Sequence, residues 1–135
     1  MDAGQSRRGP AQSEVILVVD DEEVVRRVVR KVLEAEGYLV LEAEGGVEAL
    51  EVLMERNPRV DLVLTDGTMR GMDGWDLVRV IGAILPGLPT ILMTGWAVPP
   101  AKKLPASPTA VLEKPFAPAM LTERVRNVLA APGRA

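Results

Sequence analysis

Four short, unbroken apolar runs restrict the fold of this chain more than any other feature of its sequence. They are VILVV at 15–19, LVL at 62–64, TILM at 90–93 and AVL at 110–112. A strand with one solvated face alternates apolar and polar residues, whereas unbroken runs are typical of strands buried on both faces of a parallel sheet. A less apolar stretch at 38–43 indicates a fifth strand, at an edge of that sheet.

The segments between these runs have helical periodicity. In the first segment the apolar residues recur at i, i+1, i+4, i+5, i+8 and i+9 before Gly37, and they are Val24, Val25, Val28, Val29, Val32 and Leu33. Shorter apolar stripes at 50–54, 75–85 and 121–129 predict three more helices. Strands that alternate with helices indicate an α/β fold with right-handed crossovers and helices on both faces of the sheet.

One helix of this alternation is expected to be short or degraded. The segment 97–108, where a fourth helix would fall, contains Pro99, Pro100, Pro105 and Pro108. Proline inside a helix costs about 3 kcal/mol, so at most one helical turn is expected, around 101–104. The chain as a whole is expected to have a disordered lead-in at 1–13, one folded domain at 14–130 and a frayed tail at 131–135.

Composition excludes several classes of function. The 135 residues include no histidine and no cysteine, which rules out imidazole acids or bases, thiol nucleophiles and disulfides. The net charge of −3 argues against direct binding of nucleic acid. The apolar runs are far shorter than the roughly 18–20 residues of a membrane span, and no secretory signal is recognisable. We therefore expect a cytoplasmic protein without a membrane partner.

Polar or charged residues follow each of the four apolar runs. They are Asp20 and Asp21, then Thr65 and Asp66, then Thr94, and finally Glu113 and Lys114. Every strand must end in something polar, so one such end carries little weight. Because the carboxyl ends of parallel strands share one edge of the sheet, where ligands bind, the four ends together predict a site there.

The residues of this predicted site favour phosphate chemistry. Asp20, Asp21 and Asp66 with Lys114 leave a charge of about −2, and crowded carboxylates either raise one another's pKa or bind a cation. An all-oxygen site of this kind suits Mg²⁺. A carboxylate can also act as a nucleophile, and Asp66, at the end of a central strand, is the natural candidate.

These stretches resemble the successive motifs of response-regulator receiver domains. The motifs appear in the family's order as VILVVDDEEVVRRVVRKVLEAEGY, VDLVLTDGTMRGMDGWDL, ILMTGW and LEKPF, and the similarity runs over 15–129. The resemblance implies a flavodoxin-like, doubly wound sheet of five parallel strands in the order 2-1-3-4-5. It also implies a signalling module rather than an enzyme.

The family's roles can be carried over residue by residue. Asp66 would accept a phosphoryl group from the phosphohistidine of a histidine kinase or histidine phosphotransfer protein. Asp20, Asp21, Asp66 and the backbone carbonyl of Thr68 would hold Mg²⁺, while Thr94 and Lys114 would bind phosphoryl oxygens. The Lys114–Pro115 bond would be cis, as the family usually has it.

The chain departs from the family at three places. Arg70 replaces the proline usual in the loop after the phosphoacceptor, which implies either a looser turn or tolerated surface variation. Val111 stands where many members carry an aromatic switch residue, and it has no ring to swing. The proline-rich segment 97–108 replaces much of a surface that many members use for output.

Two other functions remain open on the sequence. A degenerate receiver would act only as a protein-binding scaffold; Arg70, Val111 and the prolines favour it, and the complete acidic set argues against it. An aspartate-nucleophile phosphatase of the haloacid dehalogenase type would need a second acid at the position of Thr68, where none is present.

The first predicted helix has two interpretations. Glu22, Glu23, Arg26, Arg27, Arg30 and Lys31 are expected to be exposed on it, either as a solvated face with pairs such as Glu22–Arg26 and Glu23–Arg27 or, as in receiver domains, as a docking face for the phosphodonor. On the docking interpretation, Arg26→Glu slows phosphoryl transfer and leaves the fold intact.

Overall fold

The computed structural model describes residues 13–55, 59–95 and 108–131. Five strands form one parallel sheet in the order β2-β1-β3-β4-β5. They are β1 (Val15–Val19), β2 (Leu39–Ala43), β3 (Leu62–Asp66), β4 (Thr90–Thr94) and β5 (Ala110–Glu113). The sequence-based order and parallel pairing are therefore confirmed, with each strand within two residues of its apolar run.

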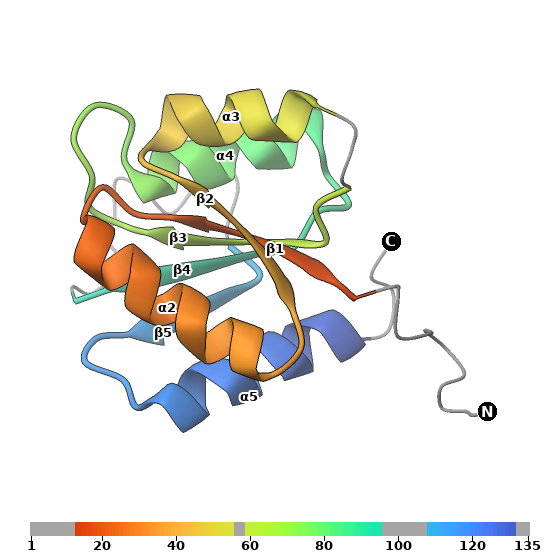
Figure 1. Ribbon diagram of the computed structural model, residues 1–135. Coiled ribbons are helices and arrows are strands. Elements are labelled where there is room, and N and C mark those ends of the chain that lie inside the picture. The colour runs from red at the N-terminus through yellow and green to blue at the C-terminus, as the bar shows by residue number, and fades with distance from the viewer. Residues whose placement is uncertain (1–12, 56–58, 96–107, 132–135) are drawn as a thin grey trace.

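Helices cover both faces of this sheet (Figure 1). They are α2 (Glu23–Ala35), α3 (Gly46–Met54), α4 (Gly74–Ile84) and α5 (Pro118–Ala130). The segment 101–104, for which one helical turn was expected, lies outside the described residues, as do the predicted lead-in up to residue 12 and the last four residues of the predicted tail. Within the described ranges, no helix is both long and apolar enough to cross a bilayer.

Alternate residues of each central strand pack into two different cores. Ile16 and Val18 of β1 point to the core under α2 and α5, whereas Leu17 and Val19 point to the core under α3 and α4. Every residue of β1, β3 and β4 is buried. Burial on both faces explains why these strands show no apolar–polar alternation in the sequence.

Helix α2 differs from the expectation in which face it buries. Its buried residues are Arg26, Val29 and Leu33, while Val24 and Val28 are 76% and 57% exposed. Arg26 pairs with Glu42 of β2 and not with Glu22, although the expected Glu23–Arg27 pair forms. The prediction that Arg26 lies on an exposed face is therefore wrong, because a cross-element ion pair compensates the burial of its charge.

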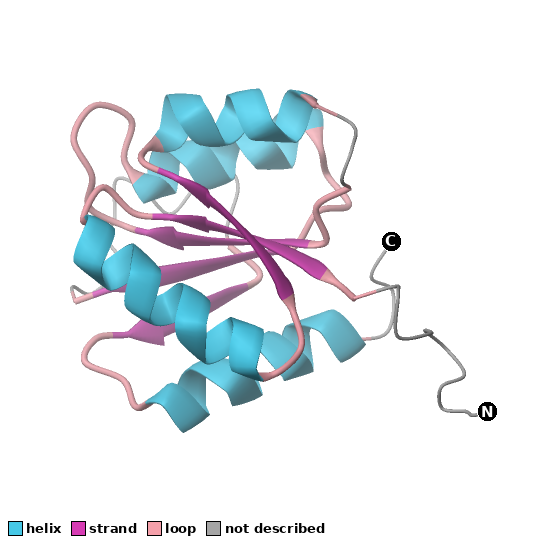
Figure 2. Ribbon diagram, in the orientation of Figure 1, coloured by secondary structure: helices cyan, strands magenta, loops and turns pink. Residues whose placement is uncertain are grey.

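The parallel strands bring their carboxyl ends to one edge, as the arrowheads in Figure 2 show. Helix α4 begins directly against this edge. A Cβ on Gly74 would lie 2.1 Å from the backbone oxygen of Asp66 and 2.8 Å from the Cα of Gly67, and the Gly74 amide donates to the Gly67 oxygen at 2.9 Å. Only glycine allows the helix to approach the end of β3 this closely.

We expect Gly74→Ala to destabilise the protein by about 1–3 kcal/mol, because the added methyl group forces rigid backbone apart. Urea unfolding measures this change. The matched control is Gly82→Ala, at an exposed position of the same helix, which should be neutral or stabilise by up to about 1 kcal/mol. Equal effects of the two substitutions would contradict the close approach at Gly74.

Candidate functional site

Three aspartates converge at the carboxyl edge of the sheet. Asp20 and Asp21 follow β1, and Asp66 is the last residue of the neighbouring strand β3. Each offers a carboxylate oxygen, and these oxygens lie within 4.8 Å of one another. The structure thus brings Asp66 together with Asp20 and Asp21, as predicted, although at least 45 positions separate them in the sequence.

Lys114 places a positive charge beside this cluster. It follows β5, two strands away from β3, and its Nζ donates to Oδ1 of Asp66 at 2.8 Å. The Lys114 side chain is about one-third exposed and that of Asp66 is almost fully buried. The ammonium group thus offsets part of the charge of a buried carboxylate. The Lys114–Pro115 peptide bond is cis, which confirms that expectation.

Asp20 is the deepest of the three acids, with no exposed surface. Its Oδ1 accepts a hydrogen bond from the Glu22 amide at 2.9 Å, whereas its Oδ2 is buried without a partner in the described part of the chain. Burial raises the pKa of Asp20 to about 6; the Glu22 amide opposes this shift, and the nearby Asp66 carboxylate adds to it. A buried carboxylate oxygen without a partner is what a bound cation would satisfy.

Asp21 lies at the mouth of the site and contacts the loop after β3. Its Oδ2 accepts from the Arg70 amide at 3.1 Å, and the Arg70 Nε lies 3.8 Å away on a side chain that is almost wholly exposed. Arg70, which replaces the family's proline, therefore holds this loop against Asp21 through its backbone amide. Its exposed guanidinium adds a positive charge beside the Asp21 carboxylate.

All of these groups except the fully buried Asp20 line an open hollow of about 580 Å³. Its walls are Asp21, Glu22, Asp66, Thr68, Arg70, Gly95 and Lys114. Thr68 is exposed on this wall, but Thr94, at the end of β4, is buried and is not part of it. The structure brings the carboxylates of Asp20, Asp21 and Asp66 together and places Lys114 in a hydrogen bond with Asp66. The chemical roles expected for these four residues, and for Thr68 and Thr94, stay predictions.

A second, mainly apolar hollow of about the same volume lies at the opposite end of the sheet, between the carboxyl ends of α3 and α4 and the loops that follow them. Its lining includes Leu53, Ile84 and Leu88, with Arg59 and Asp61 as charged neighbours. It contains none of the residues expected at the site.

This chain has a doubly wound parallel sheet with an acidic cluster and a lysine at its carboxyl edge, which is the edge where such sheets bind their ligands. The sequence profile of the response regulator receiver domain matches residues 16–126. The chain belongs to this family and is thus a receiver domain of two-component signalling.

Relatives with known names agree with this assignment. The chain is 38% identical over 119 residues to the chemotaxis protein CheY1 of Helicobacter pylori strain J99, covering 84% of this chain and 95% of that protein. It is also 38% identical over 119 residues to the sensor kinase CckA of Brucella abortus, covering 87% of this chain but 13% of that much longer protein.

Solved structures show the same fold. The signal receiver domain of a histidine kinase from Syntrophus aciditrophicus superposes with a TM-score of 0.82 at 28% identity, over 91% of this chain and 95% of that one. The receiver domain of the hybrid histidine kinase CckA superposes with a TM-score of 0.70 at 34% identity, over 85% and 98%. The flavodoxin-like fold expected from the sequence is therefore confirmed.

The raised pKa of Asp20 predicts an unusual pH dependence in metal-free protein. A folded-state pKa above the unfolded value means that ionising Asp20 costs folding free energy as pH rises from about 4 to about 6. Asp20→Asn should therefore stabilise the metal-free protein at pH 7, on the order of 2–3 kcal/mol, and lose this advantage near pH 4.

Urea unfolding in chelator at several pH values measures this difference. Glu51→Gln, at an exposed position of α3, is the control and should change stability little at any pH. A destabilised Asp20→Asn protein at pH 7 would show that the buried carboxylate is not a cost to the metal-free fold.

Proposed function

We propose that this chain is a phosphoacceptor module of a two-component phosphorelay, which takes a phosphoryl group onto Asp66 in a Mg²⁺-dependent reaction. The observation that carries the proposal is the cluster of Asp20, Asp21 and Asp66 with Lys114 bonded directly to Asp66. The donor would be the phosphohistidine of a histidine kinase or a histidine phosphotransfer protein. Relatives that are named as a sensor kinase and a hybrid histidine kinase support this class of partner.

The donor set fits Mg²⁺. Asp20, Asp21 and Asp66 offer only carboxylate oxygens, and Asp20 has a buried oxygen without a partner in the described chain. We propose that these three carboxylates and the backbone carbonyl of Thr68 hold the ion, which takes few protein ligands and keeps several waters. When bound, Mg²⁺ would neutralise charge that develops on the phosphoryl oxygens.

The protein's own residues would act as follows. A carboxylate oxygen of Asp66 forms a bond to phosphorus while the phosphorus–nitrogen bond of the donor breaks, and the electron pair stays on the donor imidazole. Lys114, which already donates to Asp66, would then pair with a phosphoryl oxygen. The hydroxyl of Thr94 would donate a hydrogen bond to another phosphoryl oxygen. The position of the end of β4 would then depend on whether Asp66 is phosphorylated.

The direct test is incubation with acetyl phosphate and Mg²⁺, followed by intact mass. We expect a single phosphoryl adduct in the wild type and none in Asp66→Asn, because an amide cannot act as the nucleophile. Asp76→Asn, on α4 and paired with Arg79, is the control and should keep the adduct. The absence of an adduct in wild-type protein, with this donor and with a phosphorylated histidine partner, would favour the scaffold function instead.

The exposed face of α2 supports docking of the phosphodonor. Val24 and Val28, one helical turn apart, expose most of their side chains close to the acidic edge, where α2 begins. Helix α2 also packs beside α5, on which Met120 is 47% exposed (Figure 1). Exposed apolar side chains on neighbouring helices are the usual centre of a protein interface.

Val28→Glu should slow phosphoryl transfer from a histidine phosphotransfer protein by roughly tenfold or more, because it places a charge in an apolar contact. Its rate with acetyl phosphate should not change, since a small donor needs no docking face. Rapid-quench kinetics with both donors measures this split. Met54→Glu, at the far end of α3 and at nearly the same exposure, is the control and should leave both rates unchanged. A parallel loss with both donors would argue against docking at Val28.

A further inference from the structure

Arg26 is the one buried arginine of α2, and it contacts the backbone of the acidic site, not its carboxylates. It is 9% exposed, and its Nη1 donates to the backbone oxygen of Asp20 at 2.8 Å in a buried position. Arg27, the next residue, has a largely exposed side chain that pairs with Glu23. No role for Arg26 follows from the proposed chemistry, since it is not among the residues that line the hollow.

The bonded carbonyl occupies a special place in the chain. It belongs to the peptide group between Asp20 and Asp21, and a peptide group is planar. A hydrogen bond that fixes this oxygen therefore fixes the plane from which both aspartates project. The Asp20 amide is held as well, since it donates to the Ala43 oxygen of β2 at 3.1 Å.

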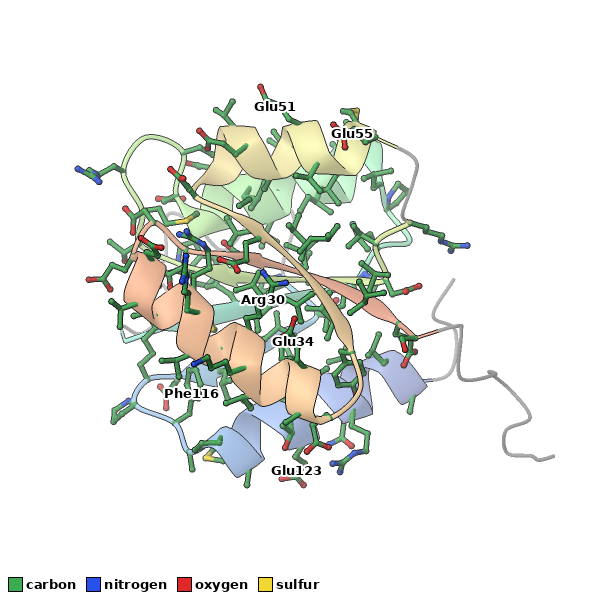
Figure 3. The ribbon with its side chains drawn as sticks, in the orientation of Figure 1. Arg30, Glu34, Glu51, Glu55, Phe116 and Glu123 are labelled. Carbon is green, nitrogen blue, oxygen red and sulfur yellow. The ribbon has the colours of Figure 1, made fainter. Side chains whose placement is uncertain are left out.

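Arg26 is itself held in one orientation. Its Nε donates to Oε1 of Glu42 at 2.7 Å, and the other oxygen of Glu42 accepts from Arg30 at 2.7 Å. Arg30 in turn bonds Glu34 one turn further along α2 (Figure 3). Hydrogen bonds from Arg30 and then Arg26 lower the pKa of Glu42, so this carboxylate stays ionised. The guanidinium of Arg26 thus has a fixed anchor on β2.

The choice of arginine matters for this arrangement. A guanidinium presents separate N–H groups in a rigid fork, so it can bond Glu42 and the Asp20 carbonyl at the same time. An ion pair that only joined α2 to β2 would need the bond to Glu42 alone. The second bond, to the backbone of the site, is the one that this simpler role does not explain.

We infer that Arg26 is a positioning residue, which orients the Asp20–Asp21 peptide group so that both carboxylates face a divalent cation. The inference rests on the proposed function only in that a cation binds these acids. Groups that orient metal ligands from behind typically contribute 10-fold to 100-fold to metal affinity. Arg26 would have this role although it touches neither metal nor phosphoryl group.

The experiment measures Mg²⁺ affinity by calorimetry on Arg26→Gln, with no phosphodonor present, so that docking on α2 has no influence. We expect a loss of roughly tenfold relative to wild type. Arg26→Lys keeps the charge but cannot make both hydrogen bonds, so its Mg²⁺ affinity should lie between those of wild type and Arg26→Gln. It also replaces Arg26→Gln as the test variant if that protein does not fold. Arg27→Gln removes an adjacent charge, and Val29→Ala removes buried apolar volume from the same helix; both should keep the wild-type affinity.

A second readout needs no metal. The Glu22 amide donates to Oδ1 of Asp20, so its proton chemical shift reports how this carboxylate is oriented. We expect the Glu22 amide resonance to move in Arg26→Gln and Arg26→Lys and to stay in place in the two controls. A merely structural ion pair would change the unfolding midpoint of the Arg26 variants without changing either readout in the folded protein.

The two hypotheses fail in different ways. Wild-type protein that binds no Mg²⁺ would overturn the metal part of the proposed function, and the Glu22 resonance would then decide the role of Arg26. Mg²⁺ binding in wild type with equal affinity in both Arg26 variants would overturn the positioning role alone. An unmoved Glu22 resonance in both variants would also overturn it.

Discussion

The structure depends on how negative charge is accommodated at one edge of a parallel sheet. Asp20 is fully buried and has a raised pKa of about 6, and Asp66 is nearly buried against Lys114. A buried, ionised carboxylate costs folding free energy unless a cation pairs with it. The short ion pair to Lys114 and the bond of Glu22 to Asp20 reduce this cost without removing it. The fold therefore keeps, at a cost in stability, an acidic cluster that could hold a metal ion.

The sheet and the acidic cluster at its edge can largely be predicted from the sequence, because two physical rules suffice. Unbroken apolar runs at 15–19 and 62–64 predicted buried parallel strands, and parallel strands bring their carboxyl ends together. The contacts among Asp20, Asp21, Asp66 and Lys114 follow from that geometry. The strand ends also agree with the prediction, since Asp66 is the last residue of β3 and Thr94 the last residue of β4.

Other parts could not be predicted from local patterns. Arg26 was placed on the exposed face of its helix because charged residues are rarely buried, yet Arg26, Val29 and Leu33 form the buried face at spacings of three and four. The evidence for the burial of Arg26 lay in a different segment of the sequence. Glu42 comes two residues after the buried Val40 along β2, so both side chains point to the same face of the sheet. Recognising the pair requires knowing how α2 packs against β2, which no local pattern contains. The close approach of Gly74 to the end of β3 likewise depends on tertiary packing.

The central claim is that acids far apart in the sequence form one cation site at this edge. Substoichiometric Mn²⁺ added to ¹⁵N-labelled protein tests it most directly, because a paramagnetic ion broadens only the amide resonances close to it. We expect selective broadening at Asp20, Asp21, Gly67 and Lys114 that excess Mg²⁺ reverses. The broadening should weaken as pH falls below about 6, because the raised pKa of Asp20 lets it take up a proton there. Broadening spread evenly over exposed acids such as Glu51 and Glu123, or broadening unaffected by Mg²⁺, would contradict it.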